Sequence, residues 1–364
     1  MSRFLPEPAH RHGSTERFGI LLVNLGTPEA ATAPAVKKYL AEFLADPRVV
    51  EIPSFAWKPV LHGIILNTRP KKSAAKYAQV WTSEGSPLAV HTERQAKLLQ
   101  GYFGHAGEQR VCVMHAMRYG QPAIADVIGK LKEEQCSRIL VLPMYPQYAA
   151  STTASVMDAV GAALARIRNL PEIRLVRSFH DDPGYIRALA ASVQEHWARN
   201  GRGEKLVMSF HGLPRFSLDR GDPYHCECHK TARLLAEALG LKADGHVVTF
   251  QSRFGRAEWL QPYTQATLEK MAGKVKTVDV ICPGFVADCL ETLEEIAMEC
   301  KAAFLNKGGR ELRYIPALNE RHEFVAALHA IARRQMGDWL ARPQPSAEEL
   351  RNTETRAKTL GASR

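Results

Sequence analysis

The chain has 364 residues, of which 45% are hydrophobic, which is enough for a large core and, at usual domain sizes, for two domains. No stretch approaches the roughly 18 apolar residues that a membrane span requires, and the N-terminal residues lack a signal-peptide core, so we expect a cytoplasmic protein. Seven scattered cysteines fit a reducing compartment and argue against a disulfide framework.

The net charge is +10, which would suit a nucleic-acid binder. However, the Lys and Arg residues are spread through every segment, and no helix-turn-helix, zinc-finger or RNP motif accompanies them. We therefore expect no nucleic-acid partner, and instead a surface that meets acidic small molecules or anionic lipid.

Strand-like runs alternate with helix-like runs along the chain. The predicted strands are 19–26, 110–119, 138–146, 173–179, 205–212, 246–252 and 277–284, and helix-like segments follow them, to Phe43 and at 122–134, 152–167, 184–197, 228–240, 263–273 and 289–304. This rhythm predicts βαβ units and an α/β fold of two similar Rossmann-like lobes, each a parallel sheet flanked by helices, with a cleft between them.

An internal correspondence supports the two lobes, because "GILLVNLGTP" at 19–28 and "KLVMSFHGLP" at 205–214 both run from a buried strand into Gly-x-Pro. We expect an N-terminal lobe at 17–172, a C-terminal lobe at 173–315, a helix at 316–340 that packs back on the N-terminal lobe, and a flexible tail at 341–364.

One segment of the first lobe, 53–81, departs from the rhythm and is expected to form an apolar lip. Phe55, Trp57 and Ile64 lie in a short helix-like stretch that is followed at once by Arg69 and further basic residues. The lip would suit a flat apolar ligand that carries carboxylates, or a membrane surface. The alternative is a core helix with a solvated basic end.

In "VMSFHGLP" at 207–214, a histidine stands where a strand stops. The apolar run before it is β-prone and Gly212 and Pro214 cannot continue it, so His211 should lie at the carboxyl end of the strand. Ligands bind at that edge in open α/β folds. The alternative is a histidine whose ring is satisfied by a loop carbonyl.

Acidic residues follow another strand end, in "CPGFVADCLETLEEIAMEC" at 282–300. At helical offsets Asp288, Glu291 and Glu295 share one face near a helix N-terminus. An acidic helix face is often merely solvated, which is the alternative. If His211 and Glu291 meet in one pocket, they form a mixed N/O site that suits ferrous iron and that can also move protons near neutral pH.

A rival metal site is "YHCECHK", which places His225, Cys226, Cys228 and His229 within a few residues. Its C-x-C step projects the thiols differently from the CxxC loops of zinc and iron–sulfur sites, which disfavours such a site but leaves the role of the cluster open. No GxGxxG, P-loop, GxSxG or HExxH motif is present, which disfavours a dinucleotide enzyme, a kinase, a serine hydrolase or a zinc peptidase.

Eight motifs together resemble those of the ferrochelatases, especially the bacterial ones. They occur in the family's order, between about Gly19 and Ala330, and are "LLVNLGTP", "GSPL", "MRYGQP", "YPQYAASTTAS", "SFHGLP", "FQSRFG", "WLQPYT" and "CPGFVADCLETLEEI". The resemblance implies insertion of ferrous iron into protoporphyrin IX, with release of two protons, as the last step of protoheme synthesis.

The resemblance also implies roles for individual residues. His211 matches the family's active-site histidine and metal ligand, Glu291 matches its partner carboxylate and second metal contact, and Asp288 matches an acidic path on the same helix. Residues in the family's porphyrin-contacting motifs are Leu25, Arg69, Ser86, Arg118, Tyr119 and Trp259. We expect no cofactor, because iron is a substrate, and a monomer or weak dimer with transient contact to the inner membrane.

Two positions depart from the family pattern. Cys289 stands where some relatives have histidine, and Leu25 stands where others have Tyr or Met, so neither is assigned a metal-ligand role. The tail has no cysteine after Cys300, so we predict no [2Fe–2S] cluster of the kind that animal relatives hold there.

Three alternative functions remain open. Within enzymes, the porphyrin could be coproporphyrin III, or the protein could be another tetrapyrrole chelatase. A different class is a porphyrin or heme carrier without turnover. The acidic helix beside His211 argues against a carrier, since a carrier needs an axial ligand but no proton path.

Overall fold

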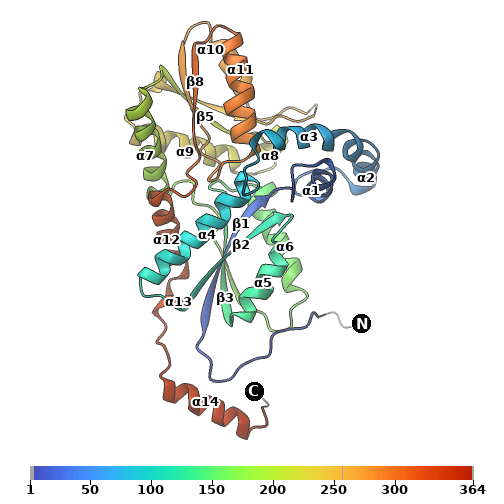
Figure 1. Cartoon of the computed structure of the whole chain (residues 1–364), viewed down its shortest axis with the longest axis vertical. Coiled ribbons are helices and arrows are strands. Elements are labelled where there is room, and N and C mark those ends of the chain that lie inside the picture. Colours follow the sequence, from blue (N-terminus) through green and yellow to red (C-terminus); the bar gives the residue numbers. More distant parts are fainter. Residues whose placement is uncertain (1–3, 256, 363–364) are drawn as a thin grey trace.

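The computed structural model describes residues 4–255 and 257–362, and two four-stranded parallel sheets organise it (Figure 1). In the first sheet the order is β2-β1-β3-β4, and in the second it is β6-β5-β7-β8. The strands are β1 (Arg17–Gly26), β2 (Val111–Tyr119), β3 (Cys136–Pro143), β4 (Glu172–Leu175), β5 (Lys205–His211), β6 (His246–Gln251), β7 (Thr277–Ile281) and β8 (Glu311–Ile315). The identical strand orders confirm the prediction of two similar lobes.

The helices of the first lobe include an excursion of α1 to α3 that projects beside the contact region between the lobes (Figure 1). The first-lobe helices are α1 (Ala33–Ala45), α2 (Ser54–Val60), the π-helix η1 (Leu61–Ile65), α3 (Leu66–Val80), α4 (Pro87–His105), α5 (Ile124–Glu133), the π-helix η2 (Ala150–Ala154) and α6 (Ser155–Leu164).

The later helices surround the second sheet and return to the first lobe. They are α7 (Pro183–Asn200), α8 (Arg215–Asp219), α9 (Tyr224–Ala238), the 3-10 helix η3 (Ala243–Gly245), α10 (Thr264–Met271), the π-helix η4 (Glu291–Cys300), α11 (Lys301–Asn306), α12 (His322–Met336), α13 (Asp338–Ala341) and α14 (Ala347–Thr359).

Alternation along β1 shows why this sheet is buried on both faces. Phe18, Ile20 and Leu22 join a core with α4 and α12, whereas Leu21 and Val23 join a second core with α5 and α6. Successive side chains of a strand point to opposite faces, so a continuous apolar run indicates helices on both sides.

Two features of the sheets differ from the expected arrangement. The boundary at 172/173 falls within β4, which pairs with β3 of the first sheet. The strand β8 closes the second sheet, although no strand was expected at 311–315. The tail at 341–364 contains α14, where Ser346 and Glu349 make a reciprocal capping box at the helix start, and its flexibility stays a prediction.

The segment expected at 316–340 contains α12 and α13, which are separated by Gly337 with φ +46°. Helix α12 packs against α7 and α4. At its end Trp339 is fully buried, its ring stacks with Phe18 of β1, and its indole N–H donates to Glu172 Oε1 at 3.0 Å. The C-terminal helices therefore complete the core of the first lobe.

Replacing Trp339 with alanine should lower the free energy of unfolding by about 3–5 kcal/mol, because the change leaves a large cavity beside β1. Urea unfolding followed by circular dichroism would measure the loss. As a control, Leu360→Ala removes an exposed side chain of the same chain end and should change stability by less than about 0.5 kcal/mol. Equal effects of the two changes would contradict this packing role.

Candidate active site

His211 is the last residue of β5 and lies opposite Gln251, the last residue of β6. The next backbone N–H, that of Gly212, donates to the Gln251 carbonyl at 2.8 Å. A Cβ at position 212 would lie 2.7 Å from that carbonyl oxygen and 3.0 Å from the Trp259 ring, so only glycine fits there. The predicted position of His211 at a strand end is therefore correct.

The imidazole of His211 is half-buried between two aromatic rings, with ring centroids 6.5 Å from Trp259 and 6.4 Å from Phe285. Its Nδ1 lies 2.7 Å from the Gly212 carbonyl oxygen. The loop carbonyl of the alternative interpretation is thus present. Because a carbonyl only accepts, Nδ1 must carry the proton and Nε2 is left as the basic nitrogen. The contact orients the ring and leaves its ligating nitrogen available.

Gln251 connects His211 to the acidic helix. Its buried side-chain amide accepts from Ser209 Oγ of β5 at 2.7 Å and donates through Nε2 to the Glu291 carbonyl at 2.8 Å. One side chain therefore fixes the start of η4 against the strand that carries His211. The sequence analysis missed this residue, although it lies in the "FQSRFG" motif directly after a strand.

Glu295 was expected on the same helix face as Glu291 but was not selected as a site residue. Ser252, which has a left-handed φ of +64°, donates to it from both its backbone N–H, at 2.6 Å, and its hydroxyl. Burial raises the pKa of Glu295 and the charge of Glu291 adds to the rise, while the bonds from Ser252 and the charge of His211 oppose it. His211, Glu291 and Glu295 therefore form one electrostatic group.

Asp288 does not belong to this group. It precedes η4 and is buried, and it accepts from Tyr314 Oη at 2.6 Å, Asn319 Nδ2 at 2.7 Å and Thr292 Oγ1 at 3.0 Å. Both of its oxygens have partners within the second lobe, so the structure gives Asp288 an anchoring place in the loop and does not bring it to His211. Asp288 and Glu291 were expected to share one helix face because they are three residues apart, but the helix begins only after Asp288.

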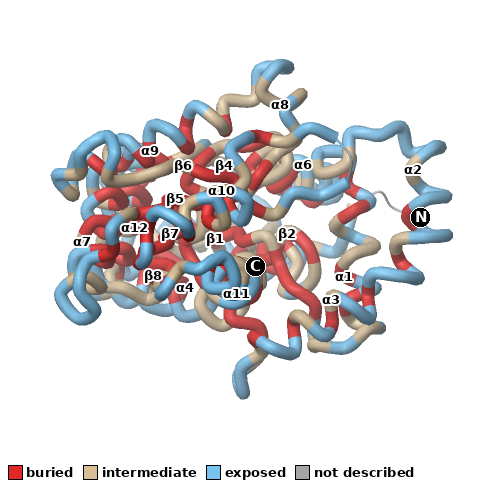
Figure 2. Tube along the Cα trace, turned by 90° about the horizontal axis from the view of Figure 1, so that it is seen from above, coloured by how far each residue is buried: buried red, intermediate tan, exposed pale blue. Residues whose placement is uncertain are grey.

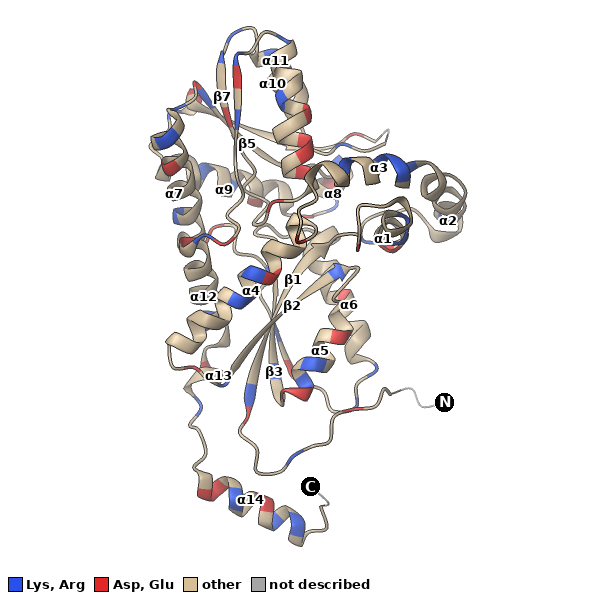
Figure 3. Ribbon diagram, viewed as in Figure 1, with Lys and Arg blue, Asp and Glu red and all other residues tan. Residues whose placement is uncertain are grey.

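The remaining acidic residues of η4 face the helix α3. Lys76 of α3 pairs with Glu294 at 3.0 Å and with Glu299 at 2.8 Å, and Figure 3 shows the acidic residues along the helix next to α3. Tyr77 lies nearby and is buried. Burial, and next the charge of Glu291, raise the pKa of its phenol well above its usual value. Glu291 therefore lies between the strand that carries His211 and α3.

Leu25 and Ser86 lie where the first lobe meets the second. Leu25 packs with Leu88, Ala287 and Cys289 in one small apolar cluster that joins the lobes. Ser86, at the start of α4, accepts from Thr27 Oγ1 at 2.8 Å. The two positions that depart from the family pattern, Leu25 and Cys289, are thus apolar partners of each other.

Arg118 and Tyr119 are engaged inside the first lobe. Arg118 Nη2 lies 2.5 Å from Asp46 Oδ2 and its Nε donates to Ser155 Oγ at 2.7 Å, while the buried Tyr119 hydroxyl donates to the same carboxylate at 2.8 Å. Tyr119 is fully buried, so the structure does not present it to a ligand. Substrate contact for the motif "MRYGQP" was implied by the family resemblance, and the partner Asp46, which lies 72 residues away in the chain, was not anticipated.

The lip is exposed on its outer side (Figure 2). Phe55 is 83% exposed and Ile64 is 57% exposed, whereas Leu61 is fully buried, so the segment is neither a core helix nor wholly free. Arg69 places its guanidinium 4.0 Å from the Phe254 ring centroid and so reaches the second lobe. Near His211, the buried indole N–H of Trp259 has no hydrogen-bond partner among the described residues.

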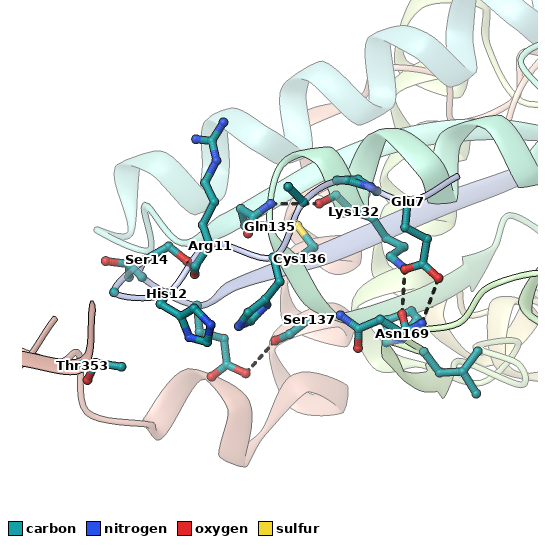
Figure 4. Close-up of a pocket in the computed structure, with 18 residues that line it drawn as sticks. Glu7, Arg11, His12, Ser14, Lys132, Gln135, Cys136, Ser137, Asn169 and Thr353 are labelled. Carbon is teal, nitrogen blue, oxygen red and sulfur yellow. Dashed lines mark hydrogen bonds and ion pairs between the residues drawn. The ribbon is translucent and has the colours of Figure 1, made fainter. Parts of the chain in front are cut away.

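The four candidate ligands in "HCECH" lie on α9, where Cys228 is buried and Cys226 is exposed, so the thiols point to different sides. No group of three His, Cys, Asp or Glu side chains that could hold a metal occurs in residues 4–255 and 257–362. Two cavities, of about 400 and 390 Å³, lie elsewhere. The first is between the N-terminal arm and the first lobe (Figure 4), and neither is lined by His211 or Glu291.

Known proteins are similar to this chain over its whole length. The family model described as Ferrochelatase matches residues 17–336. A protein named Ferrochelatase from Aromatoleum aromaticum is 65% identical and covers 100% of both chains, and one from Azoarcus sp. is 64% identical, covering 100% of this chain and 99% of its own. Among solved structures, SirB from Bacillus subtilis with Fe3+ has a TM-score of 0.53 at 12% identity, covering 90% of this chain and 98% of its own. This likeness supports the fold.

Replacing Asp46 with asparagine should destabilise the protein by about 3 kcal/mol at pH 7, because Arg118 loses its carboxylate in a buried site. Burial alone would raise the pKa of Asp46, but hydrogen bonds from Ser155, the Arg48 backbone and Tyr119, with the charge of Arg118, leave that pKa lowered. The lowered pKa stabilises the fold above the unfolded value of about 3.9, and this contribution is lost as the pH falls below it.

Urea unfolding at several pH values would test this. The difference between wild type and Asp46→Asn should be constant from pH 7 to 5 and should shrink below about pH 4. As the control, Asp158→Asn breaks a pair with Arg48 whose aspartate side chain is 50% exposed, and should cost less than about 1 kcal/mol. A difference for Asp46→Asn that stays unchanged down to pH 3 would refute the proposed ionisation.

Proposed function

This chain belongs to the ferrochelatase family, whose members insert ferrous iron into a porphyrin in the final step of heme synthesis, and we propose that His211 and Glu291 carry that step here. The protein is thus a lyase of the metal-chelatase type, with iron and a porphyrin as its substrates. Protoporphyrin IX is the porphyrin that we propose, with protoheme as the product.

The chemistry requires a base beside the metal. A free-base porphyrin is planar, and two inner N–H groups occupy the hole that the metal enters, so insertion of one Fe²⁺ must release two protons. Bending the ring exposes the nitrogen lone pairs, and a nearby base then removes the protons. His211 Nε2 can accept one proton, and the carboxylates of Glu291 and Glu295 can pass protons towards solvent.

One observation supports these roles above the others. Nδ1 donates to the Gly212 carbonyl, so Nε2 carries the lone pair of the neutral ring, and Gln251 holds the helix of Glu291 against the strand of His211. An imidazole and a carboxylate suit a borderline cation such as ferrous iron, and so small a ligand set releases it readily. Of the residues in the family's porphyrin-contacting motifs, we propose Trp259 and Arg69 as porphyrin contacts. The indole N–H of Trp259 has no hydrogen-bond partner among the described residues.

An anaerobic assay tests the proposal. Wild-type protein with ferrous iron and protoporphyrin IX should remove free-base porphyrin fluorescence, while His211→Ala should bind porphyrin and lose at least about a hundredfold in insertion rate, as expected for loss of a base. Glu291→Gln should lose activity in the same assay. Coproporphyrin III is assayed in parallel, and faster insertion of iron into it than into protoporphyrin IX would favour the alternative substrate.

His246 provides the matched control, because it stands at the opposite, amino end of β6 in the same sheet. His246→Ala should keep the wild-type rate. Porphyrin binding without insertion by the wild type would favour the carrier, and full activity of His211→Ala would reject the assigned base.

We also infer that the lip brings a cytoplasmic monomer or weak dimer into transient contact with the membrane surface. Phe55, Ile64 and Ile52 are 83%, 57% and 48% exposed, and Lys58, Lys71 and Lys72 accompany them. Exposed apolar side chains with a basic margin suit an anionic interface. No described helix has the length and hydropathy needed to cross a bilayer.

Co-sedimentation with vesicles that contain anionic lipid would measure this contact. Phe55→Ser should reduce the bound fraction severalfold, because a buried phenyl group contributes about 2 kcal/mol. Leu360→Ser, which changes an 88% exposed apolar residue at the other end of the molecule, should have no effect. Equal binding by wild type and Phe55→Ser would exclude the lip as the contact.

A further inference from the structure

We propose that His225 and His229 on α9 form a second site for a borderline divalent cation, separate from the substrate iron site. The two residues are four apart, so they lie one above the other on the same face of the helix. Their ring centroids are 4.4 Å apart with an angle of 52° between the planes. At metal–nitrogen distances of about 2.0–2.1 Å, one cation can bridge rings at this separation.

Both rings rest on the same aromatic side chain. The ring of His225 is nearly parallel to that of Phe250, at 5.7 Å and 20°, and the ring of His229 lies 6.1 Å from it. Phe250 belongs to β6 and is buried, so it is a fixed support. The pair is therefore held in place before any cation arrives, which reduces the entropic cost of binding.

The ring nitrogens of both histidines are available. Neither ring has a hydrogen-bond partner among the residues that the structure describes, although His246, His211 and His91 each have one. Burial lowers the pKa of both, and the neighbouring His225 lowers that of His229 further. Neutral imidazole is the form that binds metals.

The pair lies on the other face of the second sheet from His211. Phe210 pairs with Phe250 in register, and His211 pairs with Gln251. Successive residues of a strand point to opposite faces, so Phe250 directs its ring towards α9 while Gln251 faces η4. A cation between His225 and His229 is thus separated from the iron site by the thickness of the sheet.

The donor set indicates which cations would bind. Two imidazoles without a carboxylate suit Ni²⁺, Cu²⁺ or Zn²⁺ and disfavour Mg²⁺ and Ca²⁺, which require oxygen ligands. The charge of Arg215 acts on His225 and opposes any cation. The inferred affinity therefore depends on coordination by nitrogen, with water in the remaining positions.

Isothermal titration of the full chain with Ni²⁺ at pH 7.5 would test the site. Wild type should bind one equivalent more than the double variant His225→Ala/His229→Ala, and the single variant His229→Ala should weaken that equivalent at least about tenfold. Both side chains lie on the helix surface, so circular dichroism of the variants should match wild type.

Three controls separate this site from other imidazoles and thiols. His211→Ala should keep the α9 equivalent, which distinguishes it from the iron site. His10→Ala/His12→Ala, which removes the other histidine pair with rings 4.7 Å apart, should also keep it, as should Cys226→Ser. The proposal is overturned if the double variant binds as much Ni²⁺ as wild type, or if His211→Ala alone abolishes all binding.

Discussion

The geometry around the candidate active site depends on the side-chain amide of Gln251. Its oxygen accepts from Ser209 in β5 and its nitrogen donates to the carbonyl of Glu291, so a single buried group connects two strands and a helix. A buried amide must satisfy both of its ends, and an apolar residue here would leave the Ser209 hydroxyl without this acceptor. The same amide thereby sets where the carboxylate of Glu291 can stand relative to His211.

The carboxylates near the candidate active site differ in their hydrogen bonds. Asp288 has hydrogen-bond partners on both oxygens and anchors a loop, whereas Glu295 is held by Ser252 and Glu291 interacts with the Cys289 thiol. A carboxylate whose lone pairs are already used is a poor metal ligand or base. Hydrogen-bond saturation therefore distinguishes Asp288 from Glu291, the carboxylate that we propose as the partner of His211.

Much of this could be predicted from the sequence, because local patterns determine it. Apolar runs that end in Gly-x-Pro located both sheets and placed His211 at a strand end. Contacts between distant residues could not be predicted: Asp288 meets Tyr314 in the next strand and Asn319 just after it, and Arg118 meets Asp46 from 72 residues away. The wider winding of η4 was also missed, since its apolar positions suit an α-helix equally well.

The two lobes resemble each other, and they share one hydrophobic core. One continuous core includes Phe18 and Leu140 of the first sheet, Met208 and Phe210 of the second, and Phe324 of α12. Cutting the chain between the sheets would expose apolar faces on both fragments, so neither lobe is expected to fold by itself. Because both lobes share this core, the chain should unfold as one cooperative unit.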